Sequence, residues 1–338
     1  MIIAQSHQKK KSLDKWTDKK IDSQYMSNRL HSIGLNGRAF RMGNCSQEIF
    51  SLSCEAGCDV HRIFNASLCR DRLCPVCQWR RARVLTAKTT TAIELSECRV
   101  IAVTLTLRNC EPTELKTQLK LLSKACSRLM RFKRLSFVQG YIRTIEITHN
   151  AKSDTFHGHI HALWTVPESY FLKSNSDYLG HTELCALWQK AAGVDYLPSC
   201  RIQAVKRGDE NAAVREVAKY ISKGSDVAGL SDTNLLTYAN AVKGFRMFAS
   251  AGNLKVSDKD IEAGMLKAGE DDTPKEICPT CGARMIETTH TFDGRKYVKK
   301  DSSYYIHPNE PPQNIKTLPG QQAGHYVFHN CTVNIVQY

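Results

Sequence analysis

Three histidines alternate along one short segment of the chain, at His157, His159 and His161. Successive side chains of a β-strand point to opposite faces, so the three imidazoles would share one face. The residues between and beside them form the other, mostly apolar face: Phe156, Gly158, Ile160, Ala162, Trp164 and Val166. Same-face neighbours are about 6.5–7 Å apart along a strand, so two rings can converge on one ion. A polar strand surface is the alternative interpretation, but neutral imidazole is a common ligand for divalent metals, and we predict a metal site.

A third ligand should come from a neighbouring strand, and Glu146 is the best candidate. It alternates with Ile145 and Ile147, which would take the core face. Two histidines and a carboxylate leave coordination positions open for a substrate oxygen, so the ion could act as a Lewis acid on a phosphate. Mg²⁺ or Mn²⁺ suits that chemistry, and Zn²⁺ remains an alternative.

The second candidate site lies on a predicted helix at residues 212–223. One stripe, at i, i+3, i+4 and i+7, is apolar and predicts the buried face: Val214, Val217, Ala218 and Ile221. A second stripe is displaced by about 200° and is polar: Glu216, Lys219, Tyr220 and Lys223. A phenol with a pKa near 10 needs activation before it attacks, and a metal ion and Lys223 would both favour the phenolate. Glu216 is placed to act as a general base, while ordinary helix ion pairs are the alternative.

Cysteines are concentrated near the N-terminus, and the chain holds 14 of them without a recognisable secretory signal. Reduced thiols in clusters more often hold metal than form disulfides. Cys69, Cys74 and Cys77 supply three ligands of a tetrahedral zinc site. The fourth ligand is open among Cys45, Cys54, Cys58 and His61. A redox role for Cys74 and Cys77 is the rival, but the arginines that follow suit DNA binding better.

A second, weaker signal is the pair Cys278 and Cys281 near the C-terminus. It is half of a possible zinc-ribbon-like site. The candidates for the remaining ligands are His325, His329 and Cys331.

The charge of the chain points to a polyanionic partner. The net charge is +14, and residues 1–90 hold 16 Lys/Arg against 7 Asp/Glu. Nucleic acid is the usual partner of such a basic region, and four arginines near the cysteines are the predicted DNA contacts: Arg72, Arg80, Arg81 and Arg83. No apolar run approaches the roughly 20 residues of a membrane span, so we expect a cytoplasmic protein without a membrane partner.

The elements that position these residues alternate between strand and helix. Strands are predicted at 99–107, 141–148, 156–166 and 201–205, and helices at 114–134, 182–191, 212–223 and 234–241. The hairpin between the second and third strands makes them antiparallel neighbours. The order favours an α+β fold, with a ferredoxin-like antiparallel sheet and helices on one face.

We expect four regions along the chain. A basic, Cys-rich zinc and DNA-binding region covers 1–90, and the catalytic domain covers 97–256. A polar linker spans 257–274, and a small module with the Cys-x2-Cys motif covers 275–338.

Four motifs in this order resemble the rolling-circle replication initiators of plasmids, the Rep group with an HUH endonuclease domain. In chain order they are Cys69–Arg81, Val103–Thr106, Phe156–His161 and Glu216–Lys223. The similarity spans roughly 36–255. Gly158 departs from the family, which more often has proline there, but the ligands on either side are intact.

The resemblance implies roles for these residues. His159 and His161 would bind the divalent ion, with Glu146 at an acidic position often used as the third ligand and His157 optional. Tyr220 would attack a phosphate, which gives a 5′-phosphotyrosine and a free 3′-OH primer. Glu216 occupies the position that activates water in the single-tyrosine branch. Asn44-Cys45 is similar to the family's upstream cysteine, which favours Cys45 as the fourth zinc ligand.

The expected partners are single-stranded or hairpin origin DNA and a host helicase and polymerase, because the chain has no Gly-x4-Gly-Lys-Ser/Thr loop of its own. An HUH transposase or relaxase is the alternative enzyme, and a non-catalytic zinc-containing DNA-binding regulator is the alternative from another class. The single tyrosine on the helix and Glu216 before it favour replication.

Overall fold

The structure of this protein is a computed structural model, which describes residues 12–172, 176–222, 225–267, 276–300, 325–328 and 331–334. The chain divides into two compact units, residues 1–300 and 301–338. In the second unit, β10 (His325–Phe328) pairs antiparallel with β11 (Cys331–Asn334).

Some predicted site residues fall outside this description. They are Lys223 and His329 entirely, and the side chains of Tyr220, His325 and Cys331.

A five-stranded antiparallel sheet lies at the centre of the first unit, in the order β6-β3-β5-β4-β7. Its strands are β3 (Arg99–Thr106), β4 (Gly140–Asn150), β5 (Thr155–Val166), β6 (Cys200–Ala204) and β7 (Phe248–Gly252). The long hairpin β4–β5 was predicted from the alternating sequence, whereas β7 was not. The α+β class and the antiparallel pairing are confirmed.

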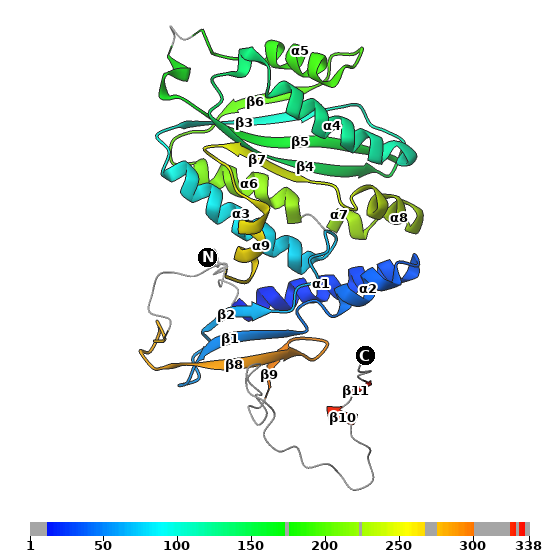
Figure 1. The fold of residues 1–338 in the computed structure, drawn as a ribbon, viewed down its shortest axis with the longest axis vertical. Coiled ribbons are helices and arrows are strands. Elements are labelled where there is room, and N and C mark those ends of the chain that lie inside the picture. Colours follow the sequence, from blue (N-terminus) through cyan, green and yellow to red (C-terminus); the bar gives the residue numbers. More distant parts are fainter. Residues whose placement is uncertain are drawn as a thin grey trace, which may run out of the picture. The chain divides into compact units, whose positions relative to one another are not determined.

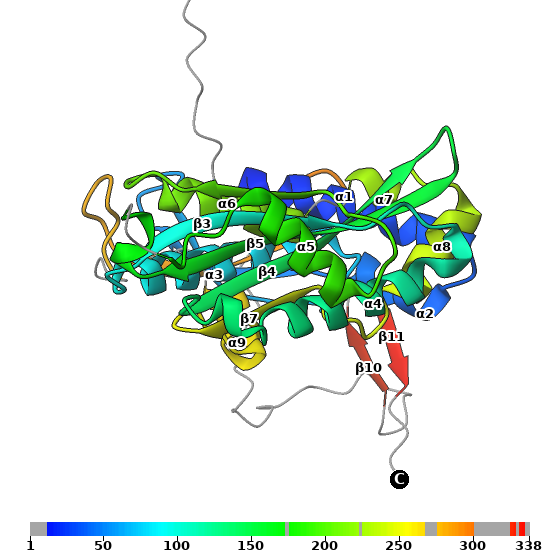
Figure 2. The same ribbon diagram turned by 90° about the horizontal axis from the view of Figure 1, so that it is seen from above.

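One face of this sheet packs against α4 (Leu115–Leu129), which in turn packs against α5 (His181–Ala192) (Figures 1 and 2). The apolar side chains of the strands alternate onto this face and are fully buried: Ile101, Val103, Leu105, Ile145, Ile160 and Trp164. The close approach of α4 accounts for the glycine at position 158. A Cβ at that position would lie 2.7 Å from Cδ1 of Leu122, so glycine lets α4 approach the strand.

The opposite face, which carries the histidines, is also covered by helices, so the expectation of helices on one face only is wrong. α6 (Glu210–Ser222) packs on β4 and β5, and α3 (Pro75–Glu94) packs on α6 (Figure 1). The physical reason is that this face is apolar at one end, where Ile142 and Leu163 are buried with Val214 and Val217 of α6. Burying that surface requires a second helical layer.

The cysteine-rich region forms another layer with a sheet in the order β2-β1-β8-β9. Its strands and helices are β1 (Glu48–Cys54), β2 (His61–Ala66), β8 (Met285–Phe292), β9 (Tyr297–Lys299), α1 (Ser12–Ser32) and α2 (Asn36–Gly43). β8 pairs with all of β1, so residues from near both ends of the chain share one sheet. This differs from the expected separate module at 275–338.

The predicted linker at 257–274 begins instead with a helix, α9 (Asp258–Lys267), which packs against α3. Met265 is buried, and Glu262 forms an ion pair with Arg81 at 3.0 Å. The polar composition of this segment reflects the solvent-facing side of a short helix. The remaining helices are η1 (Pro112–Glu114), η2 (Lys133–Leu135), η3 (Glu168–Phe171), α7 (Ser225–Ala228) and α8 (Asp232–Ala241).

Candidate metal and nucleophile site

The register of the β4–β5 hairpin brings a carboxylate and two imidazoles together. Glu146 lies directly opposite His159, and Thr144 lies opposite His161. Nε2 of His159 is 2.6 Å and Nε2 of His161 is 2.9 Å from the same Oε2 of Glu146. Three predicted ligands from two adjacent strands therefore point at one position.

This group fits a divalent ion. Two neighbouring ligands of an octahedral ion with bonds of about 2.1 Å lie about 3 Å apart, close to the observed separations. Glu146 is only 5% exposed, and a buried carboxylate requires a charged or hydrogen-bonding partner. In addition, Nδ1 of His159 is buried and has no hydrogen-bond partner within the described residues. The ligand atoms of all three residues lie within 4.8 Å of one another.

His157 shares the strand face but does not belong to this ligand group. Its ring centre is 5.1 Å from that of His159. Burial and the neighbouring His159 lower the pKa of His157, while a hydrogen bond with the backbone of Leu107 opposes that shift. His157 therefore lies beside the ion site and contacts the backbone.

The helix that carries Tyr220 lies on the histidine face of the sheet. Oγ1 of Thr144 donates to the carbonyl of Val217 at 3.2 Å, and Thr144 is the direct neighbour of His161 across the hairpin. Val214, Val217 and Ala218 are buried, as the apolar stripe predicted. Tyr220 follows three residues later on the same helix.

On the exposed face of α6, Glu216 forms an ion pair with Lys219. This contact joins two members of the predicted polar stripe. The carboxylate of Glu216 is nevertheless about half exposed, at 53%.

Four cysteines, Cys45, Cys69, Cys74 and Cys77, form one cluster with all sulfurs within 4.8 Å. The sulfur of Cys45 is 3.5 Å from that of Cys74 and 3.6 Å from that of Cys77, and Cys69 and Cys77 are 3.7 Å apart. Four sulfurs bound to zinc at about 2.3 Å lie about 3.8 Å apart, so the cluster has the dimensions of a tetrahedral site. Cys45, the fourth ligand that the resemblance favoured, is the one the structure brings in.

A buried lysine lies against this cluster. Nζ of Lys20 donates to the carbonyls of Gly43 at 2.6 Å and Cys45 at 2.8 Å, and the residue is 0% exposed. Burial lowers the pKa of Lys20, and the nearby cysteine sulfurs act in the opposite direction. Its positive charge would balance part of the negative charge of four thiolates around a divalent ion.

The second cysteine group differs from the prediction. Cys278 and Cys281 meet Cys54 and Cys58, which were not predicted as their partners, and the four sulfurs lie within 4.8 Å. Sγ of Cys54 is 3.4 Å from Sγ of Cys281. Burial raises the pKa of Cys278, but the N–H groups of Thr280 and Cys281 donate to its sulfur and bring the pKa to about 6. All the cysteines of both clusters are free of disulfides.

The four predicted DNA-binding arginines have different surroundings. Arg80 is only 2% exposed, donates to the carbonyl of Met265 and lies over the rings of Trp16 and Trp79, so its assignment to DNA binding is wrong. Arg81 is held by Glu262. Arg83 lies exposed over Trp79, and Arg72 lines a pocket beside Glu146.

Sequence reasoning missed Cys54 and Cys58 as partners of the C-terminal pair. A signal was present, because each pair encloses or precedes a glycine in a left-handed conformation, Gly57 at φ +79° and Gly282 at φ +72°. Two short, glycine-containing cysteine loops are typical of a zinc ribbon, but their pairing depends on strands β1 and β8 lying side by side.

The described residues thus form three candidate metal sites in a basic chain, one beside the helix of Tyr220 and two of four cysteines each. The family model described as replication protein matches residues 60–301. A Protein rep of Lactiplantibacillus plantarum is 31% identical over 292 residues, which is 77% of this chain and 88% of the relative. A Protein rep of Bacillus amyloliquefaciens is 31% identical over 261 residues, which is 69% of this chain and 76% of the relative.

The chain therefore belongs to the replication protein family, and its predicted identity as a plasmid rolling-circle replication initiator is confirmed. No solved structure matches it significantly. Among the described helices, none combines the length and apolar character needed to cross a membrane.

Proposed function

We propose that this protein nicks and rejoins single-stranded origin DNA by attack of Tyr220 on a phosphodiester. The observation that carries the proposal is the placement of α6 on the same sheet face as Glu146, His159 and His161, through the contact of Thr144 with Val217. A tyrosine helix and an open ligand group on one face are the two parts that such a reaction needs.

In the forward step, the phenolic oxygen of Tyr220 forms a bond to the phosphorus, and the bond from phosphorus to the 3′ oxygen breaks. The products are a 5′-phosphotyrosine and a free 3′-OH, and the phenol proton passes to the leaving oxygen or to water. The ligand group Glu146, His159 and His161 would hold Mg²⁺ or Mn²⁺, which supplies Lewis-acid polarisation of the phosphate. Lys223 would favour the phenolate.

Glu216 has a separate role at the end of the cycle. Its carboxylate, exposed beside Lys219, would accept a proton from a water molecule whose oxygen bonds to the phosphorus. The bond from phosphorus to the Tyr220 oxygen breaks, the phenol regains a proton from solvent, and the protein is released from the last phosphotyrosine. A replication initiator without its own helicase motif also needs a host helicase and polymerase, which take over the 3′-OH.

Zinc is the metal we propose for both cysteine clusters, because four thiolates in a tetrahedral arrangement suit it. The first cluster would fix Cys45 to the start of α3, and the second would join the β1–β2 hairpin to β8. In this proposal the zinc ions are structural and the ion at Glu146 is catalytic.

The test is a covalent-adduct assay with Mn²⁺ and labelled single-stranded origin DNA, separated on a denaturing gel. We expect an adduct with the wild type and with Tyr178→Phe, which alters an exposed tyrosine elsewhere, and none with Tyr220→Phe. An adduct that persists in Tyr220→Phe would refute the assignment of the nucleophile. A wild type that forms none with any segment of its origin would favour the non-catalytic regulator.

A further inference from the structure

A pocket of about 220 Å³ opens directly beside the metal-ligand group. Glu146 and Thr144 of β4 form part of its lining, and the rest comes from the loop before α3, from α3 itself, and from α8, β7 and α9. The pocket therefore adjoins the position where the scissile phosphate would be bound. It is smaller than the roughly 300–1,000 Å³ of sites for drug-sized ligands, so it suits one nucleotide unit.

Arg72 supplies a positive charge to this pocket, whose lining also holds Arg81, Arg246 and three carboxylates. It is half-buried, and within the described residues no hydrogen bond or ion pair engages its guanidinium. Burial and the nearby Arg81 lower the pKa of Arg72, and Asp258 and Glu262 only partly oppose this. Those two acids are already paired, Glu262 with Arg81 and Asp258 with Arg246. A half-buried guanidinium without a carboxylate of its own suits a bound anion, and phosphate matches its fork of donors.

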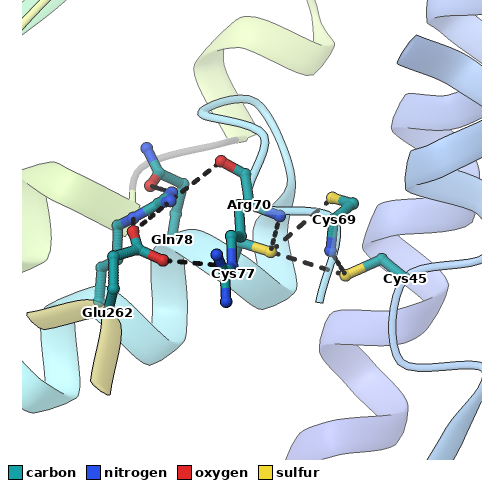
Figure 3. A network of polar contacts seen from close by, with 7 residues as sticks. Cys45, Cys69, Arg70, Cys77, Gln78 and Glu262 are labelled. Carbon is teal, nitrogen blue, oxygen red and sulfur yellow. Dashed lines mark hydrogen bonds and ion pairs between the residues drawn. The ribbon is translucent and has the colours of Figure 1, made fainter. Parts of the chain in front are cut away.

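The loop that carries Arg72 is fixed in place on both sides. Arg70 donates its N–H to Sγ of Cys77 at 3.2 Å and accepts a hydrogen bond from Arg81 at 2.9 Å (Figure 3). On the other side, the carboxylate of Asp71 accepts two hydrogen bonds from Arg38, both at 2.8 Å, and one from the N–H of Leu73. The cysteine cluster thus positions Arg72 before any ligand arrives, which reduces the entropy lost on binding.

The remaining walls of the pocket suit a nucleobase. Tyr238 of α8 and Phe248 of β7 line it together with the aliphatic side chains of Val242 and Ile261. Aromatic side chains in single-strand binding sites provide flat surfaces on which bases stack without sequence preference. A charged donor and aromatic side chains in one lining match the two chemical parts of a nucleotide, its phosphate and its base.

We propose that this pocket binds one nucleotide of the single strand next to the scissile phosphate. Arg72 contacts its phosphate and the wall with Tyr238 and Phe248 contacts its base. The inference rests on the proposed function, because it assigns the pocket to the same DNA strand. It also gives the first cysteine cluster a task beyond folding, since that cluster positions a substrate-binding residue.

The test measures binding alone, in a Tyr220→Phe background with Mn²⁺ present. Fluorescence anisotropy follows a labelled oligothymidylate of about 12 nucleotides at several salt concentrations. Arg72→Gln should weaken binding about tenfold and lower the slope of log affinity against log salt by about 0.7, the value for one phosphate contact on a single strand. Arg131→Gln, which removes an exposed arginine just beyond α4, is the matched control and should change the affinity less than twofold.

A second measurement locates the base. Irradiation of the complex with an oligonucleotide that contains 5-iododeoxyuridine should cross-link the peptides that hold Tyr238 or Phe248, as mass spectrometry will reveal. Equal affinities and salt slopes for Arg72→Gln and Arg131→Gln, or cross-links only outside the pocket, would overturn the inference. This test measures binding and not cleavage. A failed nicking assay would therefore not decide whether the pocket binds a nucleotide, and unchanged binding by Arg72→Gln would not decide whether the protein nicks DNA.

Discussion

The two kinds of metal-binding group in this protein are built in different ways. Glu146, His159 and His161 come from two strands joined by one hairpin, and the backbone register alone places them together. The tetracysteine clusters join segments far apart in the sequence, such as Cys54 with Cys281. A group set by local register needs no ion to form, whereas zinc, as we propose it, would hold the distant segments of the cysteine layer together.

The largest effect should come from removing zinc. Structural zinc sites contribute on the order of 10 kcal/mol to folding in small metal-dependent domains, so a chelator should unfold the cysteine layer. We expect two zinc ions per chain by elemental mass spectrometry and a large fall in the melting temperature after chelation. Cys77→Ser, which removes a buried ligand of the first cluster, should bind one zinc ion fewer and show part of that fall in melting temperature. An unchanged melting temperature after complete zinc removal would contradict the claim that zinc stabilises the cysteine layer.

Changing a ligand on the β4–β5 hairpin should reduce DNA cleavage strongly and stability only slightly. His161→Gln should lower the rate of DNA cleavage by at least a hundredfold, because it removes one of three ligands to the proposed catalytic ion. Stability should change by no more than about 1 kcal/mol, since the register persists without the ion. Single-turnover cleavage and thermal unfolding measure the two quantities. A His161→Gln variant with a much lower melting temperature but an unchanged single-turnover cleavage rate would contradict a catalytic role for this site.

A moderate effect should follow from Gly158→Ala. The new methyl group would press against Leu122 and cost about 1–2 kcal/mol by overpacking. Urea unfolding of the variant gives the loss in free energy. The double variant with Leu122→Ala should show a smaller loss than the sum of the two single changes, because the contact is relieved. Additive losses would indicate that α4 does not constrain the histidine strand.

The smallest effect concerns pH and the sheet of the cysteine layer. Burial lowers the pKa of His290 from 6.5 to about 4, and His61 and Lys299 act in the same direction. In the unfolded chain His290 is protonated below about pH 6.5, whereas in the folded chain it is protonated only near pH 4. The free energy of unfolding therefore falls as the pH falls. Between pH 6.5 and 5.5 the loss should be about 1 kcal/mol. His290→Gln should remove that part of the pH dependence, and an unaltered pH profile would contradict it.

The sequence predicted local features better than distant ones. Alternation of apolar residues and histidines around Ile160 was sufficient to predict which face of β5 is buried and which side chains lie beside Glu146, because a strand has only two faces. The three members of the apolar stripe of α6 whose side chains the structure describes, Val214, Val217 and Ala218, are buried as predicted. The second layer of helices was missed because Ile142 and Leu163 are a minor apolar patch on a strand face dominated by polar residues.

Pairings between distant segments were beyond the sequence pattern. Cys278 was linked in the prediction to cysteine and histidine residues that follow it, whereas the structure pairs it with Cys54 through the contact of β1 and β8. Arg80 looked like its basic neighbours, but its place on α3 faces the tryptophans rather than solvent. Charge and spacing do not reveal which side of a helix a neighbouring element will cover.

The central claim is that Tyr220 becomes covalently joined to DNA. After reaction with labelled origin DNA and Mn²⁺, nuclease and trypsin digestion should leave a nucleotide on the peptide that begins at Tyr220 and follows Lys219. Tandem mass spectrometry should place the added mass on the tyrosine. A DNA adduct on any other residue, with the peptide that holds Tyr220 unmodified, would contradict the account.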